Sequence, residues 1–328
     1  MRGVAVGLRD RFRGALLGTF VGDALGMPLE GLHGILRRGT VREMLEARLG
    51  RGTYTDDTQL MIALAEALLD VPAGGELDLE RVAARFAESF DPARGYGGNT
   101  RRILAAIRRG EPWLGAVQAR LLPGGSFANG AAMRVAPIAL AYYPNPAEVA
   151  RSAEAQAEVT GHTHLLGRFG ARILALAVLR ALRRGVEGHP FDFQGFVEEV
   201  RETAPAEFAA ALDWIVEHRD ALPRQAARRL GTGLRAVHSV PVALWAFASR
   251  AEDPEEAIVR AVNLGGDADT IGAMTGTLAG AYHGAAALPR RWLEVLEEGE
   301  TGREYVCRLA DRLWERLGLP SEAGSQAP

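Results

Sequence analysis

The sequence predicts an all-α fold, and three observations support this prediction. Apolar residues recur at helical spacing through most of the 328 residues, whereas runs of β-branched residues with a period of two are almost absent. Two segments carry glycine at every fourth position, a pattern suited to helices that pack closely. No linker is long enough to require a domain boundary, so we expect one domain over residues 8–318 and a disordered tail over residues 319–328.

The two glycine segments are the predicted helices Arg11 to Leu25 and Ile271 to Leu288. Their glycines, counting one just past the first segment, are Gly14, Gly18, Gly22 and Gly26, and Gly272, Gly276, Gly280 and Gly284. Each interior glycine costs roughly 1 kcal/mol of helix propensity relative to alanine. We therefore expect a neighbouring helix to pack against each ridge and offset this cost. A membrane dimer is disfavoured, because Asp23 interrupts the first segment and acidic residues precede the second.

Between the glycine segments and after them, periodic apolar residues predict further helices. A short run from Leu60 to Leu64 follows an acidic stretch, and the arginine-rich run Pro223 to Arg229 is predicted to be a solvated helix face. The remaining predicted helices are Leu79 to Phe90, Thr100 to Arg109, Ala131 to Tyr142, Ala147 to Val159, Leu166 to Arg184, Phe191 to Thr203, Glu207 to His218, Val240 to Ala251, Pro254 to Leu264 and Arg303 to Leu317.

Composition excludes several classes of function. The formal net charge of -3 gives no electrostatic reason to expect a nucleic-acid partner. All 38 basic residues are arginine, which excludes a phosphate-binding, Schiff-base or general-base lysine. The single Cys307 rules out a disulfide framework and a thiolate metal site. No signal peptide or membrane segment is evident, so we expect a cytoplasmic protein without a membrane partner.

The stretch Asn263 to Thr270 carries two carboxylates, Asp267 and Asp269, after two glycines and before an apolar helical run. Residues i and i+2 do not face each other on a helix, so we expect both acids to precede the helix. With the hydroxyl of Thr270, this gives three hard oxygen ligands in four residues. The alternative is an ordinary aspartate cap with acids at a helix N-terminus, and the stretch alone leaves both interpretations open.

A second stretch far away repeats this pattern. Thr55, Asp56, Asp57 and Thr58 again place acids and threonines where a helix begins. One such stretch is typical of capping, whereas two in one chain indicate facing halves of a metal site. Carboxylate and hydroxyl ligands favour magnesium or manganese over zinc.

Three glycine-rich loops lead into or out of predicted helices, over Gly22 to Glu30, Gly95 to Asn99 and Gly124 to Gly130. Such loops expose backbone N–H groups and suit an anionic diphosphate. Phe127 in the last loop could stack on a base. The alternative is that the loops are simple turns and Phe127 belongs to the core.

Two histidines near one predicted helix start are candidates for substrate contact. His162 and His164 could bind phosphate, and a metal role for them is disfavoured. The alternative is local hydrogen bonding at the helix start. His238 precedes Ser239 and Val240 and is predicted to be structural.

Taken together, these motifs resemble the ADP-ribosylglycohydrolase family of the dinitrogenase-reductase-activating glycohydrolase type, also called ADP-ribosylhydrolases. The matches fall in the same order, from about Gly14 to Gly284. They are Gly14 to Gly18 with Gly22 and Asp23, Thr55 to Thr58, Gly95 to Gly97, Gly125 to Arg134, and Gly265 to Thr270. The resemblance implies a single compact domain of orthogonally packed helices with a binuclear magnesium centre. It also implies cleavage of the bond at the anomeric carbon of ADP-ribose, in a protein or small-molecule conjugate.

The resemblance also implies roles for individual residues. The metal ligands would be Thr55, Asp56, Asp57, Asp267, Asp269 and Thr270. The substrate would be held by Gly97, His162 and the loop of Gly125, Ser126, Phe127, Ala128, Asn129 and Gly130, with the diphosphate and adenine at the loop. Glu30 matches a glutamate that closes over the metals. Gly161 stands where a threonine is usual, which leaves the choice between His162 and His164 open.

The five carboxylates of this implied site would repel one another strongly unless cations offset their charge. Two Mg²⁺ ions, with Mn²⁺ as a substitute, would neutralise four of the five. We expect the ions to orient the distal ribose while Glu30 or Asp56 removes a proton from the attacking water.

The substrate preference expected from the Gly125 to Arg134 stretch is an O-linked conjugate, such as ADP-ribosyl-serine or O-acetyl-ADP-ribose. The alternatives are an ADP-ribosyl-arginine hydrolase, a non-catalytic ADP-ribose-binding relative similar to lens crystallins, and an unrelated all-α phosphohydrolase. Retention of every implied ligand position disfavours the non-catalytic alternative. The sequence does not indicate an oligomeric state.

Overall fold

The computed structural model describes residues 7–32 and 39–318. Within these ranges the chain forms α-helices and short 3-10 helices, and its β-structure is limited to an isolated bridge between Ala128 and Arg235. The predicted all-α fold is therefore confirmed. None of the helices in this part of the chain combines the length and the apolar character needed to cross a membrane. The predicted tail over residues 319–328 lies outside the described residues.

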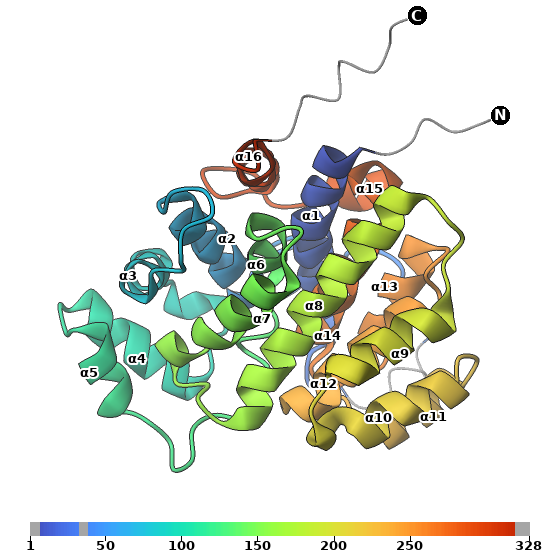
Figure 1. Ribbon diagram of the computed structural model, residues 1–328, viewed down its shortest axis with the longest axis horizontal. Helices are drawn as coiled ribbons and strands as arrows, with labels where there is room; N and C mark the ends of the chain where they lie inside the picture. The colour runs from blue at the N-terminus through green and yellow to red at the C-terminus, as the bar shows by residue number, and fades with distance from the viewer. Residues whose placement is uncertain (1–6, 33–38, 319–328) are drawn as a thin grey trace, which may run out of the picture.

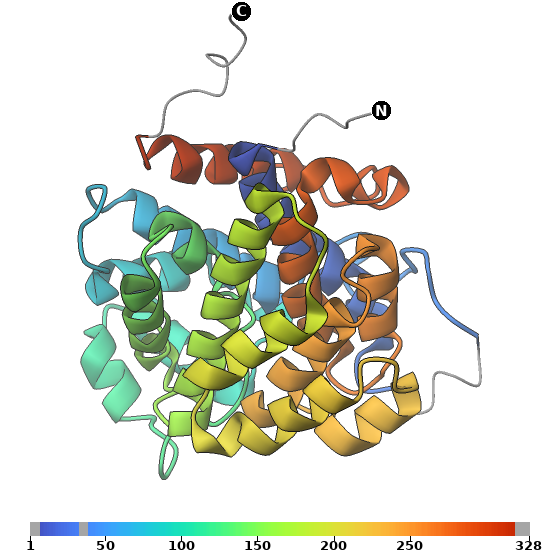
Figure 2. The same cartoon turned by 45° about the vertical axis from the view of Figure 1, so that its right-hand side comes forward.

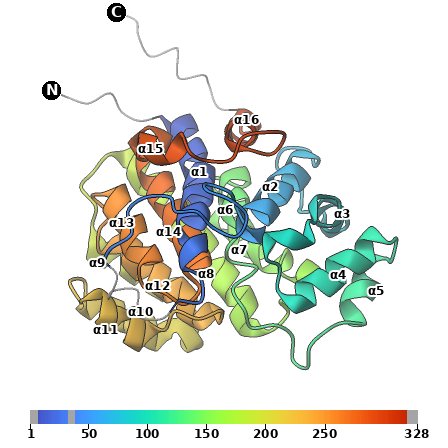
Figure 3. The same ribbon diagram turned by 180° about the vertical axis from the view of Figure 1, so that it is seen from behind.

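The helices are arranged as two flanks around a central set (Figures 1 and 3). The α-helices are α1 Leu8–Gly26, α2 Asp56–Leu69, α3 Leu79–Ser89, α4 Gly98–Arg108, α5 Trp113–Gln118, α6 Ala136–Ala141, α7 Pro146–Ala155, α8 Leu165–Glu187, α9 Phe193–Thr203, α10 Ala206–Glu217, α11 Pro223–Leu230, α12 Ala236–Ala248, α13 Pro254–Val262, α14 Ala268–His283, α15 Arg290–Leu293 and α16 Arg303–Glu315. The 3-10 helices are η1 Met27–Leu29, η3 Pro92–Arg94, η4 Glu158–Thr160 and η5 Ala285–Ala287. Helices α1, α8 and α14 run through the middle, with α2 to α7 on one side and α9 to α13 on the other.

The two glycine ridges pack against each other, as helices α1 and α14. A Cβ atom placed on Gly18 would lie 2.0 Å from the carbonyl oxygen of Gly276, and one placed on Gly22 would lie 1.9 Å from that of Gly272. These distances are far below van der Waals contact, so no side chain fits between the two backbones. The expectation that a neighbouring helix packs against each ridge is confirmed, and the neighbour of each ridge is the other ridge.

This pairing is antiparallel and positions the ends of the two helices. Gly14 near the start of α1 contacts Gly280 near the end of α14, whereas Gly26 at the end of α1 contacts Ala268 at the start of α14. The residues that follow α1 are therefore held beside the first turn of α14. At the other end of α1, Asp311 of α16 forms ion pairs with Arg9 and Arg13, and the C-terminal helices lie across this end of the molecule (Figure 2).

Some predicted helix boundaries are wrong. The helix predicted from Ala131 is broken, because the carbonyl of Asn129 accepts hydrogen bonds from the N–H groups of Ala132 and Met133, which folds this part into turns, and α6 begins only at Ala136. Helix α14 begins three residues before its predicted start and ends at His283, where Gly284 has a φ of 90°. The short helices α5 and α15 were not predicted, since they hold too few residues to show a periodic pattern.

Candidate metal centre and substrate pocket

Helix α2 begins with the first acidic stretch. Thr55 is its N-cap, and the Thr55 hydroxyl accepts a hydrogen bond from the N–H of Asp57. The same hydroxyl lies 3.2 Å from Oδ2 of Asp57 and donates to it. Asp56 and Asp57 occupy the first turn, where carboxylates interact favourably with the helix dipole.

The start of α2 is held by hydrogen bonds to Asp23, a buried carboxylate of α1. Asp23 accepts hydrogen bonds from the N–H of Thr55 (3.0 and 3.1 Å), from the N–H of Thr58 (3.1 Å) and from the Thr58 hydroxyl (2.6 Å). Burial raises the pKa of Asp23, and these hydrogen bonds oppose the effect. No role of Asp23 in the site was predicted from the sequence. The available signal was an acidic residue among apolar residues and glycines in the last turn of a helix.

Helix α14 begins with the second acidic stretch. Asp267 is its N-cap, and its carboxylate accepts a hydrogen bond from the side-chain amide of Asn129. Asp269 lies in the first turn, so the expectation that both acids precede the helix is wrong for Asp269. Their carboxylates still approach each other, because Asp267 has non-helical backbone angles (φ -85°, ψ 62°) that free its side chain from the direction set by the helix.

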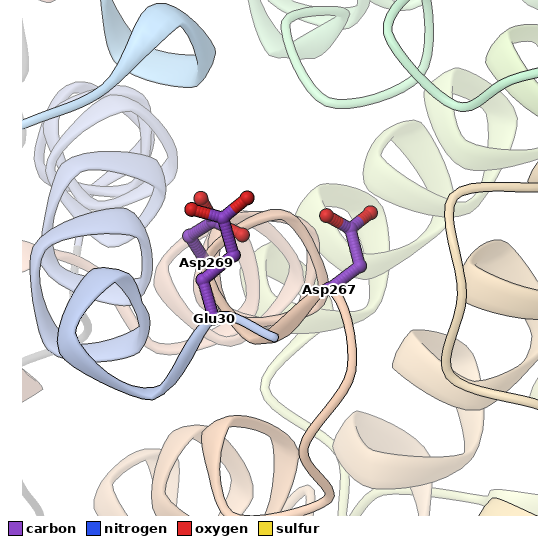
Figure 4. Close-up of side chains that lie close together, drawn as sticks. All are labelled: Glu30, Asp267 and Asp269. Atoms are coloured by element: carbon purple, nitrogen blue, oxygen red, sulfur yellow. The ribbon is translucent and has the colours of Figure 1, made fainter. Parts of the chain in front are cut away.

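Three carboxylates converge beside this first turn. The ligand oxygens of Glu30, Asp267 and Asp269 all lie within 4.8 Å of one another. Figure 4 shows the three carboxyl groups pointing to the same side, with Glu30 contributed by the segment that follows η1. The antiparallel packing of α1 and α14 brings Glu30 to this place, since the chain has only four residues to travel from Gly26.

These groups line a pocket of about 230 Å³ between the beginnings of α2, α4 and α14. The predicted site residues that line it are Glu30, Asp56, Asp57, Gly97, Ala128, Asn129, Gly130, His162, Asp267, Asp269 and Thr270. The pocket is also lined by residues that were not predicted to belong to the site, namely Leu60, Gly95, Thr100, Met133, Arg134 and Leu234. Thr55 is buried behind Asp57 and does not line the pocket.

The loop Gly125 to Gly130 reaches the pocket only with its second half. Gly125 and Ser126 pack away from it, with the N–H of Ser126 donating to the carbonyl of Gly161 (2.9 Å). Phe127 is 45% exposed and lies outside the pocket lining, so it is not a core residue. Its ring has the guanidinium of Arg235 at 5.0 Å and the ring of His164 at 6.0 Å.

The two histidines occupy different environments. His162 is buried and lines the pocket. Its Nδ1 lies 2.9 Å from the hydroxyl of Thr160. His164 caps α8 through its Nδ1, which accepts a hydrogen bond from the N–H of Leu166 (3.1 Å). Only His162 therefore faces the pocket, which separates the two candidates geometrically.

Burial raises the pKa of each aspartate in the pocket. The pKa of Asp56 is raised to about 7, with the charge of Asp23 as a further cause, and that of Asp267 is raised to about 6. Burial and neighbouring carboxylates raise the pKa values of Asp57 and Asp269 well above their ordinary range. The common cause is that several negative charges share a space from which water is largely removed.

The donor set fits hard divalent cations. Oδ1 of Asp57 is buried and has no hydrogen-bond partner in the described part of the chain. Among the pocket carboxylates described, only Glu30 has an arginine within 4.0 Å, at 3.7 Å from Arg48. Carboxylates and threonine hydroxyls without a nitrogen or sulfur donor suit magnesium or manganese.

Comparisons with known proteins identify the family that the chain resembles. The family model of ADP-ribosylglycohydrolase matches residues 5–323. Human ADP-ribosylhydrolase ARH3 is 32% identical over 352 residues, covering 94% of each chain. An uncharacterized protein of Archaeoglobus fulgidus is 35% identical over 320 residues, covering 94% of this chain and 97% of its own.

The fold is also found in a solved structure. A chain described as an ADP-ribosylglycohydrolase-related protein complex matches with a TM-score of 0.67 and 35% identity, covering 94% of this chain and 98% of that one. The family model, the human relative and the solved structure each match nearly the whole sequence. The chain therefore belongs to the ADP-ribosylglycohydrolase family.

Proposed function

We propose that this protein is a magnesium-dependent hydrolase that cleaves the glycosidic bond at the anomeric carbon of ADP-ribose conjugates. The observation that carries the proposal is that carboxylates from the beginnings of α2 and α14 line one pocket together with His162 and the end of the Gly125 to Gly130 loop. Family membership and the name of the human relative, ADP-ribosylhydrolase ARH3, support the substrate class.

Two Mg²⁺ ions would be held by oxygen ligands from both helix starts. The proposed ligands are Thr55, Asp56, Asp57, Asp267, Asp269 and Thr270. Bound ions would orient the ribose hydroxyls and lower the pKa of a water molecule. The buried Asp57 oxygen without a partner supports this assignment, because such an oxygen is stabilised by a cation.

The diphosphate would be held by backbone donors in the pocket and beside it. The N–H of Gly130, which lines the pocket, and the N–H of Phe127, which lies outside the lining, donate to no residue of the described chain. Gly97 is the N-cap of α4 and Thr100 lies in its first turn, whose N–H groups attract anions. The exposed ring of Phe127, beside the pocket, would stack on the adenine base.

Two carboxylates are candidates for accepting a proton from the attacking water. The Glu30 side chain is 43% exposed, so an incoming water molecule can reach it, whereas Asp56 is half-buried. We assign the proton transfer to Glu30 on this ground. Nearby carboxylates would also stabilise the positive charge that develops on the ribose as the bond breaks.

For the leaving group, we propose an O-linked conjugate. The support is the similarity of the Gly125 to Arg134 stretch to members that act on O-linked ADP-ribose. The test is a parallel assay of ADP-ribosyl-serine peptide, O-acetyl-ADP-ribose and ADP-ribosyl-arginine, each with magnesium and with a chelator. We expect free ADP-ribose from the two O-linked substrates only, and only with magnesium.

Other outcomes of this assay would overturn the proposed leaving group, the proposed catalytic activity or the proposed type of reaction. Faster release from ADP-ribosyl-arginine would assign the N-linked substrate. Tight ADP-ribose binding without turnover of any conjugate would indicate a non-catalytic relative. Release of AMP or inorganic phosphate would indicate a phosphohydrolase.

A further inference from the structure

A row of buried polar side chains borders the pocket and ends at His162. Arg134 donates from Nε to Oε1 of Gln156 (2.7 Å) and from Nη2 to Oγ1 of Thr160 (2.9 Å). Oγ1 of Thr160 in turn lies 2.9 Å from Nδ1 of His162. Gln156, Arg134 and Thr160 are fully buried and His162 is 5% exposed, so water does not compete for these hydrogen bonds.

The row fixes the direction of its last hydrogen bond. A guanidinium group has only donors, so Oγ1 of Thr160 must accept from Arg134. The Thr160 hydroxyl still carries one hydrogen, and Nδ1 of His162 is the acceptor beside it in the described chain. If Nδ1 were protonated, Oγ1 would accept from both sides and its own hydrogen would be buried without an acceptor, which is unfavourable. This arrangement favours an unprotonated Nδ1 with the ring proton on Nε2.

The Nε2 edge of His162 faces the pocket. A Cβ atom placed on Gly130 would lie 2.8 Å from Nε2 and 3.0 Å from Cε1, so the ring edge lies directly against this glycine. Gly130 and His162 both line the pocket, and no described residue forms a hydrogen bond with Nε2. With its proton on Nε2, His162 is therefore a hydrogen-bond donor next to Gly130, whose own N–H donates to no residue of the described chain.

We propose that Thr160, oriented by Arg134, is a positioning residue that holds His162 as the neutral tautomer with its proton on Nε2. The ligand chemistry that fits this donor is an anionic oxygen that has no proton to give, such as a phosphate oxygen of the diphosphate. The identity of the ligand in this inference rests on the proposed function. The tautomer of His162 does not, because it follows from the contacts with Thr160 and Arg134.

The electrostatic surroundings agree with a neutral ring. Burial, together with the positive charge of Arg134, lowers the pKa of His162 to about 3, and a hydrogen bond with the backbone of Thr160 opposes part of this effect. The ring is therefore uncharged at physiological pH. Its hydrogen bond to the substrate then depends on the position of a single proton, which the hydroxyl of Thr160 determines.

The tautomer is tested by NMR of protein labelled with ¹⁵N-histidine, in which long-range correlations identify the protonated ring nitrogen. The signal of His162 is assigned by its loss in His162→Gln. We expect Nε2 to carry the proton in the unmodified protein and in Thr160→Ser. In Thr160→Val, which keeps the side-chain shape but removes the hydroxyl, we expect a mixture of the two tautomers.

Binding is measured in the same proteins by calorimetric titration of ADP-ribose in the presence of magnesium. We expect roughly tenfold weaker binding in Thr160→Val, the loss of about one hydrogen bond to a charged group, and recovery in Thr160→Ser. A proton on Nδ1 in the unmodified protein would overturn the inference, and so would a Thr160→Val protein with unchanged tautomer and unchanged affinity. Failure of the unmodified protein to bind ADP-ribose, with the tautomer as expected, would uphold the positioning role and overturn the proposed function.

Discussion

The hydroxyl of Thr270 lies 3.4 Å from Oδ2 of Asp57 and donates a hydrogen bond to it, although the two residues are 213 positions apart. The contact joins the first turn of α14 to the first turn of α2. Both turns present carboxylates to one pocket, and both are held in place by α1, through its glycine ridge on one side and through Asp23 on the other. Helix α1 therefore aligns the two halves of the proposed metal centre.

Replacing Gly18 by alanine should destabilise the protein and the site together. The new Cβ would lie 2.0 Å from the carbonyl oxygen of Gly276, so α1 and α14 must separate. We expect a loss of about 1–3 kcal/mol or more in the free energy of unfolding, measured by denaturant titration. Gly115→Ala in α5 is the matched control. No described atom lies within 4 Å of its new Cβ, so we expect a gain of about 0.5–1 kcal/mol. Equal stability of the two variants would contradict this account of the ridge.

Replacing Asp23 by asparagine should weaken magnesium binding although Asp23 does not line the pocket. The new amide cannot accept all the hydrogen bonds that the carboxylate receives from Thr55 and Thr58, so the start of α2 loses its fixed orientation. We expect about 10–100-fold weaker magnesium binding by calorimetry. Thr58→Val removes one of these donors and should have a smaller effect. Unchanged affinity in Asp23→Asn would show that the carboxylate has no positioning role.

The stability of the metal-free protein should fall as pH rises from about 4 to about 7. Folding raises the pKa of Asp267 to about 6 and that of Asp56 to about 7, so the folded chain binds these protons more tightly than the unfolded chain. Ionisation then destabilises the folded state, for Asp267 by on the order of 1–3 kcal/mol above pH 7. The measurement is thermal unfolding in chelator at pH 5 and pH 8. Saturating magnesium should remove most of the difference in thermal stability between the two pH values. An identical pH dependence with and without magnesium would refute the claim that the pocket aspartates share bound cations.

Replacing Phe127 by alanine should weaken ADP-ribose binding. The ring is 45% exposed beside the pocket and is available for stacking on adenine. We expect about tenfold weaker binding of ADP-ribose and little change in the binding of free ribose 5-phosphate, measured by calorimetry. Leu222→Ala, at a position that is 65% exposed, is the control for loss of a surface apolar side chain. Equal losses for both ligands in Phe127→Ala would indicate that the ring does not contact the base.

Much of the fold could be predicted because its signals are local. The glycine ridges and the acidic stretches at helix starts are each visible within one short stretch of sequence, and the structure brings Asp57 and Asp267 into one pocket. The roles of the individual metal ligands remain predictions. Helix boundaries were less predictable. The carbonyl of Asn129 accepts hydrogen bonds from Ala132 and Met133, and these bonds form turns where a helix was predicted to begin. They depend on the tertiary packing of the loop that contains Asn129.

The supporting residues could not be predicted, because their roles arise from contacts between distant segments. Asp23 matters through Thr55 and Thr58 on another helix. Arg134 and Thr160 are ordinary helix or turn residues in the sequence, and only the fold aligns them with His162. Similarly, nothing in the Gly125 to Gly130 stretch alone indicates that its first half packs away from the pocket.

The central claim is that the starts of α2 and α14 share divalent cations. Its most direct test is anomalous diffraction from crystals soaked with Mn²⁺, which stands in for Mg²⁺ and can be located without ambiguity. We predict two anomalous peaks between the carboxylates of Asp57 and Asp269, with both helix starts contributing ligands. An absence of peaks in this pocket at saturating Mn²⁺, or a single peak bound to only one of the two helix starts, would contradict the account.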